Sequence, residues 1–336
     1  KLVKVLNKKF FLMKVQVQYS ILLIVDEKIS SSNQVIGLAE AIKIHKKEIK
    51  IKILYSHKLV PTLLPNWMIY YLLKVNLINV KSKFEYEKIN LIISCGRVSS
   101  PLSLFIKEKT QCKNIHILDP YFKRKEFDKI IIPKHDKYKK SDNYIEIIGA
   151  IVNNNNKKIS LEKIKFFKKK LSINKNKKSI SVLLGGSGKS SEFSLSDTTR
   201  LIEYLQKIDR NKFQLFFIYS RRTPQHIKKK ISNVFQSESF IWDEISENPY
   251  WYLIKHSNFF IVSSDSVSMT MDTLSTLRPV FIFRLKKIKR KICNFQDYLI
   301  EQKLTREFYG KIYCWKHKEL SEGERIAKKF LVELSE

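Results

Sequence analysis

The stretch Ser179-Ile-Ser-Val-Leu-Leu-Gly-Gly-Ser-Gly-Lys-Ser190 decides the fold. Its first six residues form a run suited to a buried parallel strand, and that run ends in three of the chain's eight glycines. A strand that enters a glycine-rich turn before a helix is typical of a doubly wound α/β sheet. The same alternation recurs along the chain. The sequence therefore predicts an α/β protein with two Rossmann-like domains that face a cleft.

The predicted elements fall into two halves. In the first half, strands are predicted at Ile21–Val25, Ile49–Leu54, Leu91–Ser94, Ile115–Leu118, Lys129–Ile132 and Tyr144–Ile148, and helices at Gln34–His45 and Pro101–Lys109. In the second half, further strands are predicted at Gln214–Ile218, Phe259–Val262 and Val280–Phe283, and helices at Asp197–Ile208, Pro224–Phe235, Val267–Thr276 and Glu322–Leu334. Four asparagines and two lysines at 153–158 cannot form a core. We therefore expect an N-terminal domain at 1–152, a basic linker with a short helix at 153–178, and a C-terminal domain at 179–336.

The composition limits the class of protein. The 336 residues carry a net charge of +32, and an apolar fraction of 43% is enough for packed cores. Most of the cations are lysine, as AT-rich coding bias would also produce, and nucleic-acid readers favour arginine. The charge is uneven, at +15 over residues 1–156, +9 over 157–178 and +8 over 179–336. We therefore expect a basic, acceptor-binding first half rather than a nucleic-acid partner.

The glycine cluster is the first candidate for ligand binding. Backbone amides of Gly185, Gly186, Ser187 and Gly188 could approach a phosphate closely. A Walker A loop would need glycine at 183, where this chain has leucine, so a nucleotide triphosphatase is not expected. The alternative is an ordinary strand–helix turn that needs glycine geometry.

A second cluster of polar residues follows the strand that ends at Val262. A helix N-terminus with free amides favours anions there, and a carboxylate further along the helix could accept bonds from a ribose diol. Simple helix capping is the alternative. The candidate residues are Asp265, Ser266, Ser268, Met269, Thr270 and Asp272.

Two further motifs belong to the second half. Arg221 and Arg222 lie at a strand-to-helix junction, where guanidinium groups could neutralise a diphosphate without a metal, although surface ion pairs would also explain them. Asn248 lies in Glu-Asn-Pro-Tyr at a helix start. The four cysteines show no zinc spacing, so no metal site is expected.

Candidates for a general base follow strands of the first half. They are His116, Asp119, His135 and Asp136, and nothing in the sequence ranks them. Each histidine taken singly is more often structural than catalytic.

Together these motifs resemble the Elongated-Mitochondria-type family, which includes plant mitochondrial fission proteins and bacterial glycosyltransferase-like proteins. The resemblance runs from Asp26 to about Trp315. It rests on Cys95-Gly-Arg-x-Ser-x-Pro101, Asp119-Pro120, Phe127–Asp136, Ser220-Arg-Arg-Thr-Pro224, Glu247-Asn-Pro-Tyr250 and Asp265-Ser-Val-Ser-Met-Thr270.

The resemblance implies a GT-B arrangement with a nucleotide-sugar as donor substrate and no resident cofactor. It also implies that Asp272, seven residues before Pro279, holds the donor ribose. The chain departs from the pattern in two places: the carboxylate is usually Glu, and the turn before the proline usually contains Gly where this chain has Leu277-Arg278.

Two functions therefore remain open. The first is sugar transfer to an envelope or lipid-linked acceptor at the cytoplasmic membrane face, and the second is a non-catalytic, membrane-associated adaptor. The segment Leu59–Leu73 is too short to span a bilayer, and either a buried helix or an interfacial segment would explain it. We expect a cytoplasmic, peripheral protein whose natural start is Met13, with residues 1–12 extraneous.

Overall fold

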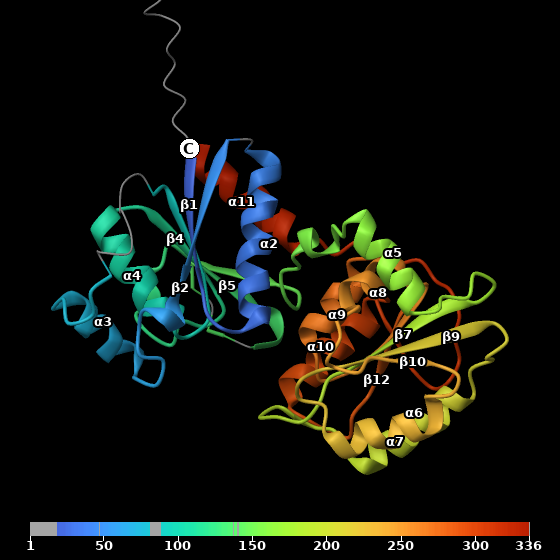
Figure 1. The fold of residues 1–336 in the computed structure, drawn as a ribbon. Helices are drawn as coiled ribbons and strands as arrows, with labels where there is room; N and C mark the ends of the chain where they lie inside the picture. The colour runs from blue at the N-terminus through green and yellow to red at the C-terminus, as the bar shows by residue number, and fades with distance from the viewer. Residues whose placement is uncertain (1–18, 47, 81–88, 137, 140, 336) are drawn as a thin grey trace, which may run out of the picture.

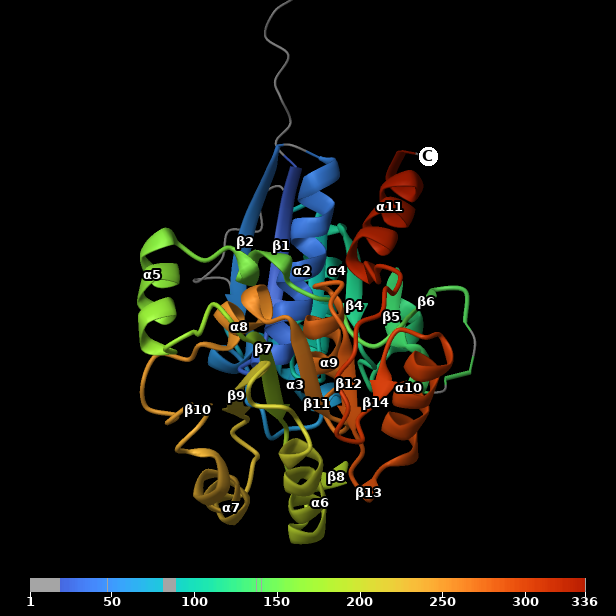
Figure 2. The ribbon, with the colours of Figure 1, turned by 90° about the vertical axis from the view of Figure 1, so that its right-hand side faces the viewer.

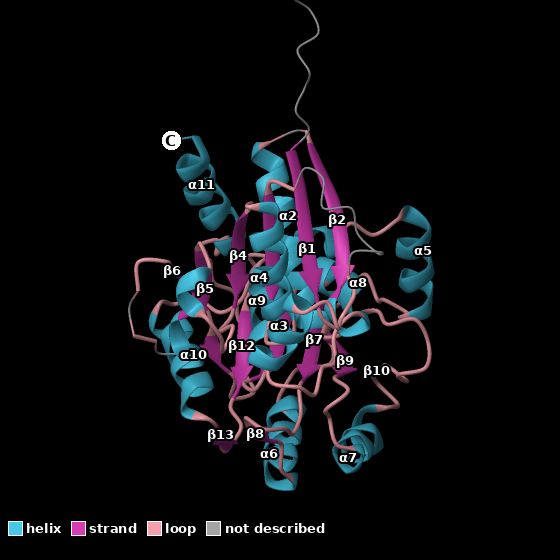
Figure 3. Cartoon of the chain, turned by 90° about the vertical axis from the view of Figure 1, so that its left-hand side faces the viewer, coloured by secondary structure: helices cyan, strands magenta, loops and turns pink. Residues whose placement is uncertain are grey.

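The computed structural model describes residues 19–46, 48–80, 89–136, 138–139 and 141–335 (Figure 1). The expectation about residues 1–12 and Met13 lies outside these ranges. The first unit is a six-stranded parallel sheet in the order β2-β1-β3-β4-β5-β6, whose strands run side by side in Figure 3. The strands are β1 (Tyr19–Val25), β2 (Ile49–Tyr55), β3 (Leu91–Cys95), β4 (Lys113–Ile117), β5 (Lys129–Pro133) and β6 (Tyr144–Ile147).

Helices cover both faces of the first sheet because its strands are apolar on both sides. Alternate residues of β1 show this: Ile21 and Leu23 pack in one core, and Leu22 and Ile24 pack in another. One face is covered by α2 (Ile29–His45) and the other by α3 (Asn66–Lys74) and α4 (Ser99–Thr110). Short 3₁₀ turns lie at η1 (Ser56–Lys58), η3 (Arg124–Glu126) and η4 (Lys134–Asp136).

The second unit repeats this plan in a sheet of order β10-β9-β7-β11-β12-β14. Its strands are β7 (Lys178–Leu184), β9 (Phe213–Tyr219), β10 (Phe240–Ile241), β11 (Phe259–Ser263), β12 (Val280–Phe283) and β14 (Arg306–Glu307). One face carries α6 (Leu195–Gln206) and α7 (Gln225–Phe235). The other carries α5 (Leu161–Lys170), α8 (Tyr250–His256), α9 (Val267–Leu274) and α10 (Arg290–Glu301). A separate pair, β8 (Ser191–Glu192) with β13 (Lys287–Ile288), is antiparallel.

These two sheets confirm the predicted fold class. In each sheet the chain reverses its direction of travel across the sheet at one point. That switch point lies between β1 and β3 in the first sheet and between β7 and β11 in the second. Ligands of open α/β sheets bind outside the carboxyl ends of the strands at such points. The residues after β1, β3, β7 and β11 are therefore the ones to examine.

The packing differs from the expected domain boundaries at both ends of the second unit. Helix α11 (Glu322–Ser335), which we expected in the C-terminal domain, packs beside α2 and contributes Ile326 and Phe330 to the first core. Figures 1 and 2 show it beside the first sheet and apart from the other helices of the second unit. Conversely, the expected linker is only partly a linker, because Phe167 of α5 belongs to the core of the second unit.

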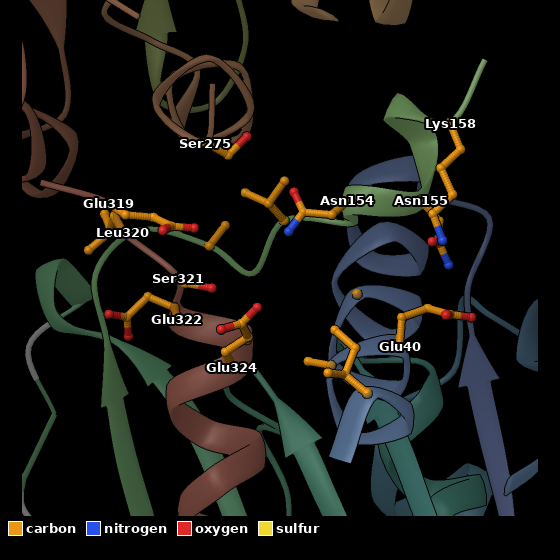
Figure 4. A pocket seen from close by; sticks show the side chains of 16 residues that line it. Glu40, Asn154, Asn155, Lys158, Ser275, Glu319, Leu320, Ser321, Glu322 and Glu324 are labelled. Carbon is orange, nitrogen blue, oxygen red and sulfur yellow. The ribbon is translucent and has the colours of Figure 1, made fainter. Parts of the chain in front are cut away.

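The chain crosses between the units beside α2. Here η5 (Asn154–Lys157) follows the first sheet, and a Cβ on Gly37 would lie 2.6 Å from the carbonyl oxygen of Val152. A cavity of about 180 Å³ lies at this crossing between α2, α11 and η5, with Glu40, Glu322 and Glu324 among its lining residues (Figure 4). Gly37 thus lets the connection lie directly on α2.

Candidate functional site

The switch point of the second sheet brings three distant motifs onto one carboxylate. The Asp265 side chain is fully buried and accepts hydrogen bonds from the Gly186 amide (2.9 Å) and the Ser263 hydroxyl (2.7 Å). Arg222 Nη2 lies 3.2 Å from the same carboxylate. Burial raises the pKa of Asp265, and the bonds from Gly186, Ser263 and Arg222 act against that rise. Asp265 is therefore a structural hub of the site.

The glycine loop has a different role in the structure from the expected phosphate cradle. All four of its amides donate to acceptors of the protein: Gly185 to Ser263 Oγ, Gly186 to Asp265, Ser187 to the Arg222 carbonyl and Gly188 to the Ser191 carbonyl. A Cβ on Gly185 would lie 2.1 Å from an Asp265 oxygen, and one on Gly186 would lie 2.0 Å from the Arg222 carbonyl oxygen. The glycines are needed because side chains and backbone of the neighbouring motifs approach so closely.

The N-terminus of α9 has amides free for a ligand. Ser266 caps the helix by accepting from the Met269 amide (3.3 Å), and no acceptor for the amides of Val267 and Ser268 is found in the described part of the chain. Thr270 is turned inward, where its hydroxyl donates to the Ser266 carbonyl. Ser268 and Met269 are partly exposed. Free amides at this end of α9 are what an anion site requires, and anion binding there stays a prediction.

One residue of this region had no signal in the sequence. Gln296 of α10 is fully buried and donates to the Ser264 carbonyl (3.0 Å), and its Nε2 lies 3.4 Å from Thr270 Oγ1. Its side-chain oxygen has no partner among the described residues. A basic run at 284–291 dominates the sequence before α10, and neither the helix nor this glutamine was predicted.

Asp272 meets the Glu-Asn-Pro-Tyr motif. Its carboxylate accepts a bond from the Tyr250 hydroxyl (2.8 Å), and Lys157 of η5 lies nearby. Burial raises the pKa of Asp272 to about 7, against the opposing effects of Tyr250 and Lys157. Asn248 is exposed and accepts from the Tyr250 amide at the start of α8 (2.8 Å), so its contact with the Asp272 region runs through Tyr250.

The adjacent arginines and the turn before Pro279 can both be placed in the structure. Arg221 is exposed, whereas its neighbour Arg222 is committed to Asp265. Leu277, in the turn where the family usually has glycine, adopts a left-handed φ of 59°. A bulky residue is strained in that conformation, so the turn keeps its glycine-type backbone without the glycine.

In the first unit, two of the four candidate bases are unsuited to the role. His116 lies within β4 and is fully buried, with Nδ1 2.7 Å from Ser94 Oγ. Burial lowers the pKa of His116 to about 3. Asp119 is held by Arg124 through two bonds (2.8 and 2.9 Å). Burial raises its pKa, but the bonds from Arg124 and from the Tyr121 amide outweigh this, and the pKa is lowered.

The other two candidates lie where the units meet. In η4, Asp136 pairs with Lys291 of α10 at 2.9 Å, and the His135 ring lies 5.2 Å from the Phe295 ring. Burial lowers the pKa of His135, which favours its neutral form. Phe295 is adjacent to Gln296, so α10 contacts both His135 and the region of Thr270. A cavity of about 140 Å³ lies here, lined by His135, Gly149, Asn294 and Tyr298 among others.

Asp26 was missed as a candidate, although it directly follows a buried strand. It lies at the switch point of the first sheet, and a Cβ on Gly96 would be 3.2 Å from its carboxylate. The Lys28 amide donates to it at 2.9 Å. Burial raises the pKa of Asp26, against the effect of that bond. The same strand-end rule that selected Asp119 could have found it.

Within the described ranges, no three His, Cys, Asp or Glu side chains are grouped so as to hold a metal ion. Among the same residues, no helix combines the length and apolar character that crossing a bilayer requires.

The family model for mitochondrial fission ELM1 matches residues 31–334. The chain belongs to the mitochondrial fission ELM1 family. Among relatives of this chain, the uncharacterized protein RP120 of Rickettsia prowazekii is 26% identical over 92% of this chain and 97% of its own length.

Solved structures similar to this chain share its two-domain fold. A UDP-GlcNAc 2-epimerase from Neisseria meningitidis bound to UDP-GlcNAc has a TM-score of 0.53 and 16% identity, covering 94% of this chain and 99% of its own. UGT71G1 from Medicago truncatula, complexed with UDP-glucose, has a TM-score of 0.52 and 10% identity, covering 95% and 90%. The fold is thus that of GT-B proteins with two Rossmann-like domains. At these identities the likeness establishes the fold alone.

Proposed function

We propose that this ELM1-family protein is a glycosyltransferase that takes its sugar from a nucleotide-sugar donor. The observation that carries the proposal is the convergence of three motifs at the second switch point, beside a helix end with free amides. The structural neighbours complexed with UDP-GlcNAc and UDP-glucose support a uridine nucleotide as the first donor to test.

In this proposal the donor diphosphate lies at the N-terminus of α9. The free amides of that end and the exposed Arg221 supply the compensating charge, so that no metal or other cofactor is required. Asp272 accepts bonds from the ribose diol. Gly185–Gly188, Arg222 and Asp265 act indirectly, because they fix the backbone around α9.

The acceptor binds the first unit, and its hydroxyl attacks the anomeric carbon of the donor sugar. The bond from that carbon to the diphosphate breaks, the nucleoside diphosphate leaves, and a base takes the hydroxyl proton. His135 is the favoured base among the four predicted residues, since it is neutral and faces α10. Asp26 is the second candidate, because it lies at the first switch point with no cation bonded to its carboxylate among the described residues. The proposed acceptor is an envelope or lipid-linked molecule at the cytoplasmic membrane face, with the protein bound peripherally.

The test is a thermal-shift screen of nucleotide-sugars, followed by calorimetry on Asp272→Ala. We expect one nucleotide-sugar to raise the midpoint, and the variant to bind it about tenfold more weakly because a ribose contact is lost. Glu301→Ala, an exposed acid at the end of α10, is the matched control and should bind as the wild type does. Equal affinity of Asp272→Ala and wild type would disprove the ribose assignment.

The adaptor remains a second candidate because one observation favours it. All four amides of the glycine loop donate to acceptors within the protein rather than to a ligand, as a scaffold would allow. If the protein is an adaptor, no nucleotide-sugar in the screen stabilises it. Neither His135→Gln nor Asp26→Asn then alters the amount of sugar-transfer product. A transfer product that disappears in either variant would instead favour the enzyme.

A further inference from the structure

Helix α3 and the loop before it expose a continuous apolar stripe. Leu63, Trp67, Tyr71 and Val75 recur every four residues, with 96%, 60%, 60% and 43% of their surface exposed. Trp67 and Tyr71 therefore lie on one face of α3, with Val75 at its C-cap and Leu63 in the loop before it. Leu77 extends the exposed apolar surface beyond the end of the helix.

This stripe is not required by the core of the first unit. The opposite face of α3 packs through Ile69, Tyr70 and Leu73, which are all buried. Large apolar side chains that remain exposed as a connected row on a well-packed helix point to an interaction surface.

Polar residues of the first unit fix this stripe in place. Arg97 donates to the Thr62 carbonyl, the Leu64 carbonyl (2.9 Å) and the Asn66 side chain (3.2 Å). Asn66 donates in turn to Ser100 Oγ (3.0 Å) and to the Pro120 carbonyl (2.8 Å). The Cys-Gly-Arg and Asp-Pro motifs therefore hold the loop before α3 beside the strand ends of the first sheet.

The segment of the chain that contains the stripe is rich in lysine. Residues 49–80 contain four lysines and neither Asp nor Glu. Lys58 is exposed and lies 5.2 Å from the Tyr55 ring, which is also exposed. One of the four, Lys74, pairs with Glu108, and Lys123 pairs with Glu126, so these two lysines add no net charge.

We propose that the α3 stripe, comprising Leu63, Trp67, Tyr71, Val75 and Leu77, docks on a bilayer that contains anionic lipids. Tryptophan and tyrosine favour the membrane interface, aliphatic side chains enter the acyl boundary, and flanking lysines are attracted by anionic headgroups. A second copy of the chain is disfavoured as the occupant, because each copy carries a net charge of +32.

Docking by this face would place the strand ends of the first sheet next to the bilayer. The inference deepens the proposed function in that it names the surface through which a lipid-linked acceptor is reached. Membrane binding itself does not depend on sugar transfer, so the two can fail separately.

The experiment compares Leu63→Ser/Tyr71→Ser with the wild type in sedimentation with vesicles. One vesicle set is phosphatidylcholine, and the other adds phosphatidylglycerol. We expect the wild type to bind the anionic set, with binding weakened by high salt, and the variant to bind at least about tenfold more weakly. The matched control is Ile245→Ser/Tyr309→Ser, which removes a similar pair of side chains (94% and 57% exposed) elsewhere and should bind as the wild type does.

Three outcomes would overturn the docking proposal. The first is that the wild type binds neither vesicle set at low salt, and the second is that the variant binds vesicles as tightly as the wild type. The third is that the wild type binds no vesicles but forms a dimer, which the substitutions dissociate. The thermal shift by a nucleotide-sugar should be unchanged in the variant. If no nucleotide-sugar raised the melting midpoint of the wild type, that result would count against the proposed function and would not affect the docking result.

Discussion

The two switch points of this molecule use polar residues in opposite ways. At the second, Gly186, Arg222 and Ser263 converge on the buried Asp265 and leave a helix end with free amides beside them. At the ends of the first sheet, Arg97 donates to the loop before α3, and Ser100 accepts from Asn66, the first residue of the helix that carries the apolar stripe. Similar strand-end motifs can therefore hold a helix end with free amides in one sheet and brace a surface in the other.

The largest expected effect tests whether crowding explains the glycines of the second switch point. Gly186→Ala should lower the free energy of unfolding by about 3 kcal/mol, because its Cβ would collide with the Arg222 backbone. Gly188→Ala is the matched control, since its Cβ would lie 3.4 Å from the flexible end of Arg222, and should cost less than about 1 kcal/mol. Urea unfolding measures both, and equal losses would contradict the crowding explanation.

The second prediction compares one carboxylate from each unit. Asp265→Asn should cost about 2 kcal/mol, because the buried bonds from Gly186 and Arg222 lose their anionic acceptor. Asp119→Asn should cost about 1 kcal/mol, since its partner Arg124 is half exposed. The comparison fails if chemical denaturation ranks the two variants in the reverse order.

The third prediction uses the opposite pKa shifts of Asp272 and Asp119. The pKa of Asp272 is raised to about 7, so its protonated form stabilises the fold below pH 4, and that contribution is lost as the pH rises through 7. The pKa of Asp119 is lowered, so its contribution is present above pH 4 and is lost on further acidification.

Asp272→Asn should therefore gain stability relative to the wild type between pH 4 and pH 8, by roughly 1–2 kcal/mol after allowance for partial exposure. Asp119→Asn should be less stable than the wild type above pH 4, and the difference should shrink as the pH falls further. Urea midpoints across this range provide the measurement. Parallel curves for wild type and both variants would show that neither shift contributes.

The smallest expected effect concerns the turn before Pro279. Leu277→Gly should stabilise the protein by about 1 kcal/mol, because glycine accepts the left-handed backbone without strain. Leu277→Ala keeps the strain and serves as the control. If the glycine variant had no higher thermal unfolding midpoint than the alanine variant, strain at this turn would not be lowering the stability of the protein.

The sequence was sufficient for the fold because buried parallel strands leave continuous apolar runs such as Ile21–Val25. It also predicted that Asp265, Arg222 and the glycine loop lie close together, because the carboxyl ends of parallel strands meet at one edge of a sheet. It could not tell that the loop amides would be used internally, since that depends on distances of a few ångströms between separate motifs. The burial of His116 was not predicted for a related reason, since a histidine just before a strand end can face the core or the cleft.

Helices posed a different difficulty. The amphipathic pattern of residues 322–334 was correct, but no pattern states which sheet an apolar face will cover. The sequence did not predict helix α10, or Gln296 within it, because the helix begins in a basic run. These failures come from tertiary partners, whereas the successes came from periodicity within one segment.

The position of α11 has a consequence for how the protein is made. Its residues follow the whole second unit in sequence, yet Ile326 and Phe330 close the core formed by Val35 and Leu38. During synthesis, the groove on α2 must stay uncovered until the ribosome has passed residue 330. The first half to emerge is therefore the last to be completed, and it waits with exposed apolar surface for which chaperones compete.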